Sequence, residues 1–175
     1  SHLHLPPLPK LSNNYLYELL HLPKLSQPKV SPDGKWVAWT WLDMGPVGNI
    51  YIAPTDGSKE PTRITNTGQH TWVASWLFDS SGLVVYHDHD GDEKDQLFEL
   101  ALNKPERLLP LTDEQFSYFI RGGQIHPSKP WLFYCANYDF STNKVLEPSW
   151  VYRHDLKSGD RIVLAKPKLP SYYVP

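Results

Sequence analysis

The sequence predicts an all-β fold, namely a partial β-propeller of three four-stranded antiparallel blades with a short N-terminal helix. One β-rich unit occurs three times, opening at Val30, Phe78 and Ile125, so that successive units are 48 and 47 residues apart. In each unit a small polar turn leads into a strand rich in β-branched and aromatic residues. Four antiparallel strands in a period of roughly 40–50 residues are typical of a propeller blade.

The first 26 residues are expected to form an arm that contains the helix. Ser12 can cap the segment NNYLYELLHL, which places Leu16, Leu19 and Leu20 on one helical face, and Pro23 stops the helix. We expect this arm to pack on the propeller.

Residues 27–175 are expected to hold the blades, with approximate bounds of 27–70, 71–117 and 118–170, and then the first strand of a fourth blade at 171–175. The strands that precede the turns are 28–30, 71–78 and 116–125, and those that follow them are 35–40, 83–88 and 131–136. The remaining pairs are 49–58 with 62–65, 96–102 with 107–112, and 150–159 with 161–165. Three blades do not close a ring, because propellers use about four to eight. We therefore expect a segment of a longer polypeptide, with outer blade faces prone to self-association.

Turn chemistry agrees with the proposed hairpins. Asp33-Gly34 and Ser81-Gly82 supply residues that tolerate positive φ. In the third copy Lys129-Pro130 suits a type I turn. The runs 83–86 and 131–135 are apolar without alternating, which indicates sheets that are covered on both faces.

Aromatic and thiol side chains in these strands are expected to serve packing. Cys135 is interpreted as a buried structural thiol. Core packing between blades is predicted for Trp36, Trp39, Trp72, Trp76 and Trp131.

Composition excludes several classes of protein. The net charge of −2 provides no basic field for nucleic acid or an anionic membrane. The single cysteine excludes an internal disulfide and a cysteine-rich zinc site. No apolar run approaches the roughly 18 residues that span a bilayer, and the N-terminus has no signal-peptide pattern. We expect no cofactor and, with one thiol and no leader, a cytoplasmic protein.

The densest group of charges is the heptapeptide HDHDGDE at residues 87–93. Asp88, Asp90 and Asp92 match the first ligands of an EF-hand calcium loop, but Gly91 falls between the acids and Glu99 lies inside a predicted strand. A hairpin with Asp90-Gly91 at its tip explains the same residues without an ion. We therefore predict a turn, with these three aspartates as calcium candidates and no assigned metal site.

Two histidine pairs are further candidates. His87 and His89 have a spacing that could bind zinc from one strand face, but no third ligand is near in sequence. His154-Asp155 could orient an imidazole for acid–base chemistry. The surrounding YRHDLKSGD is better interpreted as a strand followed by a turn.

The repeats also resemble a known family. The propeller repeat shared by TolB-like proteins and by the N-terminal domains of prolyl oligopeptidase-family serine peptidases is similar to SPDGKWVAW followed by NIYIAPTDGS and TRIT. A hairpin of acylaminoacyl-peptidase-like members, with an acidic turn before a Gln-Leu-aromatic strand, is similar to YHDHDGDEKDQLFEL. The leucine-rich helix that leads into PKLSQPKVSPDG adds to the resemblance, which covers nearly all of residues 12–175.

This resemblance implies that the parent protein is a serine peptidase. Its C-terminal α/β-hydrolase domain would carry the catalytic Ser, Asp and His, while the propeller gates and filters peptide substrates. The chain itself contains no Gly-x-Ser-x-Gly nucleophile elbow, since Ser80 has Gly82 after it but Phe78 before it. We expect no catalytic residue in these 175 residues.

Two questions stay open at this point. The Glu-Glu pair with which dipeptidyl peptidases hold a substrate amino terminus is not recognisable, because TDEQ at 112–115 is too weak a match. Cleavage of acylpeptides or oligopeptides is therefore favoured over dipeptidyl-peptidase specificity. The alternative function is a TolB-like propeller that acts as a protein-interaction module with no hydrolase attached.

Overall fold

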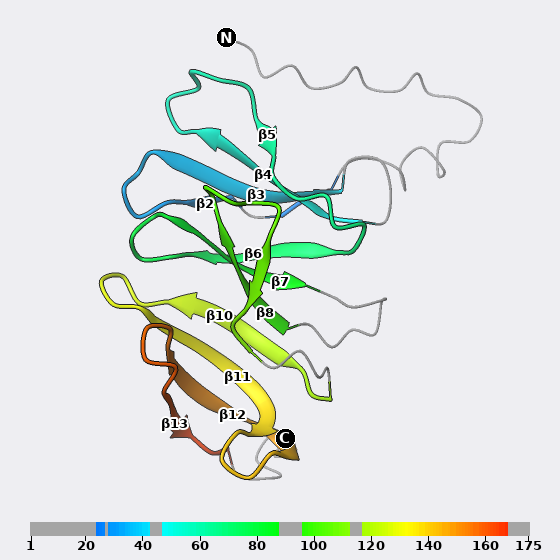
Figure 1. Cartoon of the computed structure of the whole chain (residues 1–175), viewed down its shortest axis with the longest axis vertical. Coiled ribbons are helices and arrows are strands. Elements are labelled where there is room, and N and C mark those ends of the chain that lie inside the picture. The colour runs from blue at the N-terminus through cyan, green and yellow to red at the C-terminus, as the bar shows by residue number, and fades with distance from the viewer. Residues whose placement is uncertain (1–23, 27, 43–46, 88–95, 113–116, 168–175) are drawn as a thin grey trace, which may run out of the picture.

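Figure 1 shows the computed structural model of the chain, which describes residues 24–26, 28–42, 47–87, 96–112 and 117–167. These residues form three antiparallel sheets that follow one another along the chain and are stacked along the long axis of the molecule. The all-β prediction of three sheets is confirmed. The expected helix after Ser12 and the expected fourth-blade strand at 171–175 lie outside the described residues.

The sheets are built from consecutive strands in simple up-and-down order. The first contains β1 (Lys24–Leu25), β2 (Lys29–Val30), β3 (Trp36–Leu42), β4 (Asn49–Pro54) and β5 (Thr62–Arg63). The second contains β6 (Thr71–Trp76), β7 (Gly82–His87), β8 (Gln96–Ala101) and β9 (Leu108–Pro110). The third contains β10 (Ile120–Ile125), β11 (Trp131–Asp139), β12 (Lys144–Asp155) and β13 (Arg161–Ala165). The described part of the chain has no helix, and so none that could cross a membrane.

The first sheet departs from the predicted four strands, because β1 and β2 both pair with β3. Leu25 lies opposite Trp41, whereas Lys29 lies opposite Ala38, so the register shifts by one residue between the two short strands. Pro28, just before β2, has no N–H to offer to β3. The two short strands together occupy the position of one inner strand.

The same one-residue shift recurs in the other two sheets. It lies between Val73 and Ser75 on β6 and between Gly122 and Gln124 on β10. A bulge of this kind leaves one residue out of the ladder and bends the strand. The bulged Gly123 has a φ of +113°, and a Cβ there would lie 3.1 Å from the Cβ of Ala74. Glycine is therefore required for the close approach of two neighbouring bulges.

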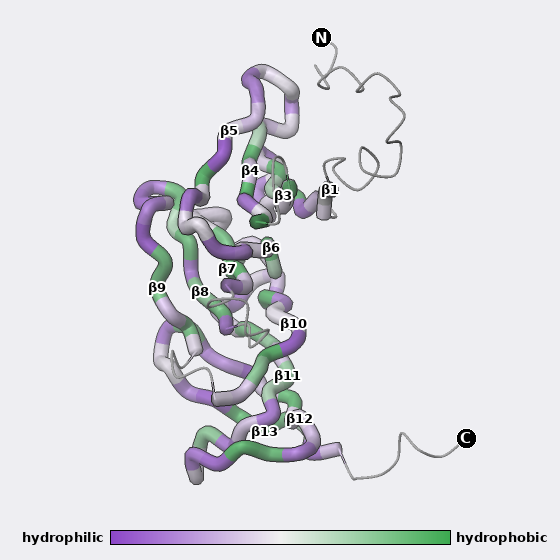
Figure 2. Tube along the Cα trace, turned by 90° about the vertical axis from the view of Figure 1, so that its right-hand side faces the viewer, coloured by the Kyte–Doolittle hydropathy of each residue, from purple (hydrophilic) through white to green (hydrophobic). Residues whose placement is uncertain are grey.

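The first strands of the sheets lie nearest to a common axis, since β6 contacts both β2 and β10. The middle sheet is covered on both faces. Leu83 and Val85 pack against Ala38 of the first sheet, whereas Val84 packs in the cluster that contains Leu132 of the third. Hydrophobic stretches accordingly recur in all three sheets (Figure 2). This arrangement confirms the expectation that the apolar run 83–86 is buried on both faces.

The predicted packing of the tryptophans is correct for two of them. Trp76 is buried between the first two sheets, and Trp36 packs against the same cluster. It is wrong for Trp39, Trp72 and Trp131, which are half-buried and belong to neither hydrophobic cluster. These alternate along their strands with buried neighbours, so they point to the opposite face.

Each of the three half-buried indoles contacts another ring or a cation instead. Trp39 stacks on Tyr51 at 6.2 Å between ring centroids, and Trp72 lies edge-on to a histidine ring. The ammonium of Lys129 lies 4.2 Å from the centroid of the Trp131 ring. The prediction that Cys135 is buried is wrong in the same way, because the residue is half-buried. Its two neighbours along β11 face the middle sheet, so the thiol points to the opposite face.

Thr40 joins the first two sheets through its side chain. It is fully buried on β3, where its Oγ1 accepts a hydrogen bond from the Val73 N–H at 3.0 Å. The same hydroxyl donates to the carbonyl oxygen of Thr71 at 3.4 Å. The contact therefore satisfies two backbone groups of β6.

We expect Thr40→Val to lower the free energy of unfolding by about 1–3 kcal/mol, because it leaves those backbone groups without a partner. Urea unfolding followed by tryptophan fluorescence measures the change. Thr62→Val, at an exposed position of β5, is the matched control and should change stability by less than about 0.5 kcal/mol. Equal effects of the two substitutions would show that Thr40 does not brace the sheets.

Candidate functional site

Of the predicted metal candidates, His87 lies in the described part of the chain. Asp88, Asp90, Asp92 and His89 lie outside the described residues. The Nδ1 atom of His87 lies 3.1 Å from the hydroxyl of Thr71, its partner on the neighbouring strand. Within the described ranges no group of three or more His, Cys, Asp or Glu side chains could hold a metal ion.

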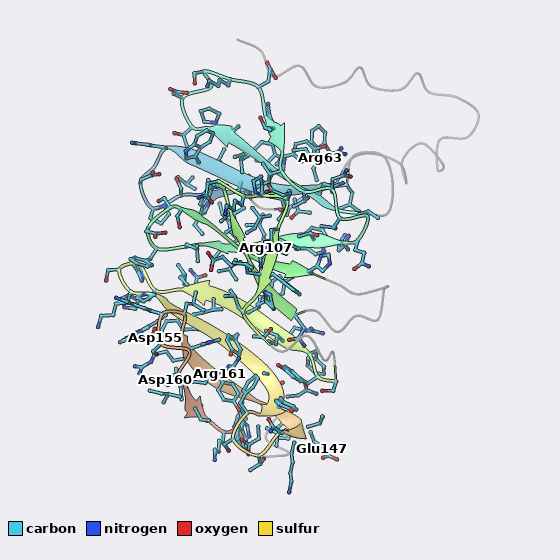
Figure 3. All side chains as sticks on the ribbon, viewed as in Figure 1. Arg63, Arg107, Glu147, Asp155, Asp160 and Arg161 are labelled. Atoms are coloured by element: carbon cyan, nitrogen blue, oxygen red, sulfur yellow. The ribbon has the colours of Figure 1, made fainter. Side chains whose placement is uncertain are left out.

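His154 and Asp155 do not form a catalytic pair. His154 is buried, and its Nδ1 lies 3.1 Å from the hydroxyl of Tyr134. The carboxylate of Asp155 instead accepts hydrogen bonds from the backbone N–H groups of Lys157 and Ser158 at 2.9 and 3.1 Å. Figure 3 shows Asp155 at the turn that joins β12 to β13. The interpretation of this segment as a strand followed by a turn is therefore confirmed.

The imidazole of His154 belongs to a buried network that the sequence did not reveal. Arg161 donates from Nε to the Tyr134 hydroxyl at 2.9 Å and from a terminal nitrogen to the carbonyl oxygen of Leu111 at 3.4 Å. Since arginine can only donate, the Tyr134 hydroxyl accepts from it and donates to His154, which is then neutral. Because Leu111 follows β9, the network joins the second sheet to the third.

Burial sets the protonation of this network. It raises the pKa of Tyr134 to about 12 although the nearby Arg161 guanidinium opposes the shift. Burial and the same positive charge lower the pKa of His154 from 6.5 to about 4. Both groups are therefore uncharged at neutral pH, which suits a structural brace between blades.

Thr112, the first residue of TDEQ, also has a structural role. Its Oγ1 accepts a hydrogen bond from the Leu97 N–H at 3.1 Å and donates to the Gln96 side chain at 2.8 Å. Thr65 makes the equivalent bonds in the first sheet, to Ile50 and Asn49. Residues 113–116 lie outside the described residues.

A hollow of about 530 Å³ lies where the first strands of all three sheets end. Its lining comes from equivalent positions of the three repeats. In each sheet the residue directly after the first strand donates its backbone N–H to the start of the second strand, and this hydrogen bond closes the first hairpin. The lining residues are Lys29, Val30 and Pro32 of the first repeat, Ser75 and Trp76 of the second, and Gln124, Ile125 and Pro127 of the third. Its volume falls within the range of about 300–1,000 Å³ that is usual for ligand pockets.

The wall of this axial hollow is fixed by a contact between adjacent blades. The indole Nε1 of Trp76 donates a hydrogen bond of 2.7 Å to the carbonyl oxygen of Lys29. Ser75, only 4 % exposed, places a buried hydroxyl with no hydrogen-bond partner at the same hollow. An unpaired buried hydroxyl costs about 1–3 kcal/mol. Sequence inspection missed this site because its residues come from three distant repeats, although each lies directly before or at the repeated turn.

The fold and the axial hollow define a β-propeller segment, and comparison with known proteins agrees. No model of a known protein family matches the chain. The chain is 26 % identical over 151 residues to dipeptidyl aminopeptidase BIII of Pseudoxanthomonas mexicana, a match that covers 82 % of the chain and 20 % of that protein. A Tricorn-like protease N-terminal subunit of Sulfurisphaera tokodaii is 43 % identical over 67 residues, which cover 36 % of the chain and 33 % of the subunit.

Solved structures share the fold. TolB of Agrobacterium tumefaciens aligns with a TM-score of 0.61 at 20 % identity, over 80 % of this chain and 49 % of its own. A prolyl endopeptidase aligns with a TM-score of 0.60 at 19 % identity, over 83 % of this chain and 20 % of its own. The expected resemblance to the N-terminal propeller of prolyl oligopeptidase-family peptidases, with TolB-like repeats, is confirmed. The chain spans about a fifth of the length of the dipeptidyl aminopeptidase and about a third of the length of the Tricorn-like subunit.

The low pKa of His154 predicts a dependence of stability on pH. In the unfolded chain His154 takes up a proton below pH 6.5, whereas in the folded chain it does so only near pH 4. The contribution of neutral His154 to stability is therefore complete above pH 6.5 and is lost as the pH falls towards 4. We expect the free energy of unfolding to fall by about 1–2 kcal/mol over this window, since solvent screens part of the charge.

In His154→Asn the amide can still accept from Tyr134 but does not titrate, so the slope over this window should be shallower. Urea unfolding at a series of pH values measures it. His126→Asn, at a half-buried ring whose Nδ1 accepts the N–H of the nearby Ser128 at 3.1 Å, is the control. A slope unchanged in His154→Asn would contradict the assignment.

Proposed function

We propose that this chain is the non-catalytic N-terminal propeller segment of a prolyl oligopeptidase-like serine peptidase. In this proposal it gates or filters the access of peptides to a C-terminal α/β-hydrolase domain of the same polypeptide, in the cytoplasm. The observation that carries the proposal is the axial hollow, at which the first strands of all three sheets end. The sequence similarity to a dipeptidyl aminopeptidase over 82 % of the chain supports it.

The geometry of the hollow suits a filter. A volume of about 530 Å³ accepts a short peptide segment but not a folded domain. Its wall is held by the hydrogen bond between Trp76 and Lys29 and by the close contact of the bulges at Ala74 and Gly123. A rigid opening discriminates by size because wider chains do not displace its backbone.

A TolB-like interaction module is the second candidate, and the TM-score of 0.61 with TolB favours it. The two functions differ in the domain that would lie C-terminal to the propeller. A Gly-x-Ser-x-Gly segment in a hydrolase domain of the same reading frame supports the peptidase. A reading frame that completes the propeller without such a domain supports the interaction module.

The isolated chain is expected to hydrolyse no peptide, because its sequence contains no nucleophile elbow. Chromogenic acyl-amino-acid and peptide substrates test this on the purified chain, beside the full-length polypeptide as the positive control. Turnover by the chain alone that a serine-directed inhibitor abolishes would disprove the assignment.

Narrowing the hollow should affect long peptides more than short ones. Val30 lines the hollow and is 59 % exposed, so Val30→Trp adds bulk without disturbing the core. In the full-length polypeptide we expect kcat/KM for an octapeptide to fall about tenfold, and that for an acyl-dipeptide by less than about twofold.

Val145→Trp is the matched control, because Val145 is 55 % exposed on β12 and does not line the hollow. It should leave both rates unchanged. Equal losses for the two substrates in Val30→Trp would count against a filter at this position.

A further inference from the structure

We propose that the outward face of the third sheet docks the next four-stranded unit of the same polypeptide, and that this unit presents an acidic side chain to Arg153. The proposal rests on the proposed function in one respect, namely that the polypeptide continues beyond residue 175. It goes further because it names the chemistry of the partner surface. Its two consequences, a covered face and an acidic partner, are measured without catalysis.

The outward face is the side of the third sheet that turns away from the middle sheet, at one end of the stack (Figure 1). Phe133, Arg153 and Ile162 lie opposite one another on β11, β12 and β13. The neighbouring Leu132 packs towards the middle sheet, so this row points outward. Ile162 is 45 % exposed, and Leu164 on the same strand is 51 % exposed. Stacked repeats bury such faces against a neighbour, so this face is expected to have one.

Two positive charges lie on this face. The ammonium of Lys129 and the guanidinium of Arg153 lie 4.2 and 4.1 Å from the centroid of the Trp131 ring, so the two cations share one indole. Asp155 lies opposite Trp131 in the ladder, but its carboxylate already accepts two backbone N–H groups of the turn that follows. A basic partner surface would be repelled by these cations and an acidic one attracted. The charge of the face therefore indicates an acidic partner.

The position of Arg153 recurs in each sheet. The first hairpins of the three sheets close with the same backbone hydrogen bond, which makes Ala38, Val84 and Phe133 equivalent. Their partners on the next strand are Ile52 in the first sheet, Glu99 in the second and Arg153 in the third. The repeat therefore shows what this position contacts wherever a following sheet covers it.

At both covered interfaces the position meets a side chain of matching chemistry. Ile52 packs against the same apolar cluster as Leu102, which lies directly after β8. Glu99 lines a pocket of about 240 Å³ together with Leu156 and Lys157, which lie directly after β12. Leu102 and Leu156 are equivalent, because each donates its N–H to the carbonyl oxygen of a residue in the first hairpin turn of its own sheet. An apolar side chain thus faces an apolar one, and an acid faces a lysine.

By the same rule Arg153 meets the corresponding turn of the next sheet, where the matching side chain is an Asp or a Glu. A second copy of this chain would instead offer the outer face of its first sheet. That face carries the exposed Arg63, which lies opposite Tyr51, so like charges would meet. The match to the dipeptidyl aminopeptidase covers only 20 % of that protein, which leaves length for a following unit.

The thiol of Cys135 reports whether the outward face is covered. Cys135 is equivalent to Thr40 and Tyr86, two side chains that reach the first strand of the following sheet. Thr40 forms hydrogen bonds with the backbone of β6. The hydroxyl of Tyr86 lies 3.6 Å from the position of a Cβ added at Gly123 on β10. We therefore expect the first strand of the next unit to lie over the thiol.

Labelling with N-ethylmaleimide measures this cover, and mass spectrometry of the tryptic peptide distinguishes Cys135 from any other cysteine. We expect Cys135 to react at least about tenfold more slowly in the full-length polypeptide than in the 175-residue chain, because the reagent must reach the thiol. Circular dichroism checks that both are folded. Equal rates would overturn the docking. A rate that falls as the concentration of the 175-residue chain rises would show that a second copy covers the face, and would also overturn it.

Substitutions of Arg153 test the charge of the partner in the full-length polypeptide. Arg153→Glu should repel an acidic partner, so that Cys135 reacts about tenfold faster, whereas Arg153→Lys should react like the unchanged protein. Arg153→Met removes the charge and should give an intermediate rate, which keeps the test decisive if Arg153→Glu does not fold. Arg107→Glu, at an exposed turn of the second sheet, is the matched control. Equal rates in Arg153→Glu, Arg153→Met and Arg107→Glu would show that the charge of Arg153 does not hold the next unit.

A zero-length carbodiimide identifies the acid, because it condenses an amine with a carboxylate to an amide and takes up the released water as a urea. In the full-length polypeptide we expect it to link Lys129 to an Asp or Glu in the turn between the third and fourth strands of the next unit. Lys104, at an exposed turn of the second sheet, is the control amine and should form no such link. A link from Lys129 to another domain or to a second copy, or no link, would overturn the proposal.

Hydrolysis of peptides by the full-length polypeptide tests the proposed function separately. An active peptidase with a freely reactive Cys135 would contradict the docking and leave the proposed function standing. A protected Cys135 and a linked Lys129 in a polypeptide without a hydrolase domain would have the opposite meaning.

Discussion

The middle sheet must bury both of its faces, and the arrangement of the other two sheets follows from this constraint. A strand presents alternate side chains to opposite faces, so Leu83 and Val85 need cover from one side and Val84 from the other. The two hydrophobic clusters provide that cover. Hydrogen bonds between sheets add to this packing. The hydroxyl of Thr40 reaches across one interface and the guanidinium of Arg161 across the other, and each bonds to the backbone of the neighbouring sheet.

Close packing at the axis follows from the same stacking. When three sheets lie face to face with their first strands adjacent, the backbones approach most closely at those strands. The bulges bend the inner strands at corresponding positions, and at Gly123 a φ of +113° and the Ala74 Cβ only 3.1 Å from the position of an added Cβ favour glycine. Beyond the bulges the strands end around open space, where Trp76 and its hydrogen-bonded carbonyl oxygen form a fixed wall.

Much of this fold could be predicted from the repeat, because spacing and turn chemistry are local properties of the chain, and Gly34 has the expected positive φ. The expectation for Ser81-Gly82 was wrong, because the positive φ of the second turn falls on Ser80. The face to which a strand residue points is not local. Trp39 and Trp131 therefore looked like core residues, although only the face that carries Ala38 or Leu132 meets another sheet. The axial hollow was missed for a related reason, since it is assembled from two or three residues of each repeat that lie nearly fifty positions apart in the sequence.

The equivalence of the lining positions has a consequence for how such a site can change. Lys29, Ser75 and Gln124 each occupy one repeat position, and their backbones are held by ladder hydrogen bonds that do not depend on the side chain. A single codon change at any of them alters the chemistry of the opening while the blade beneath it keeps its register. Duplicated repeats thus allow the lining of the hollow to change one blade at a time.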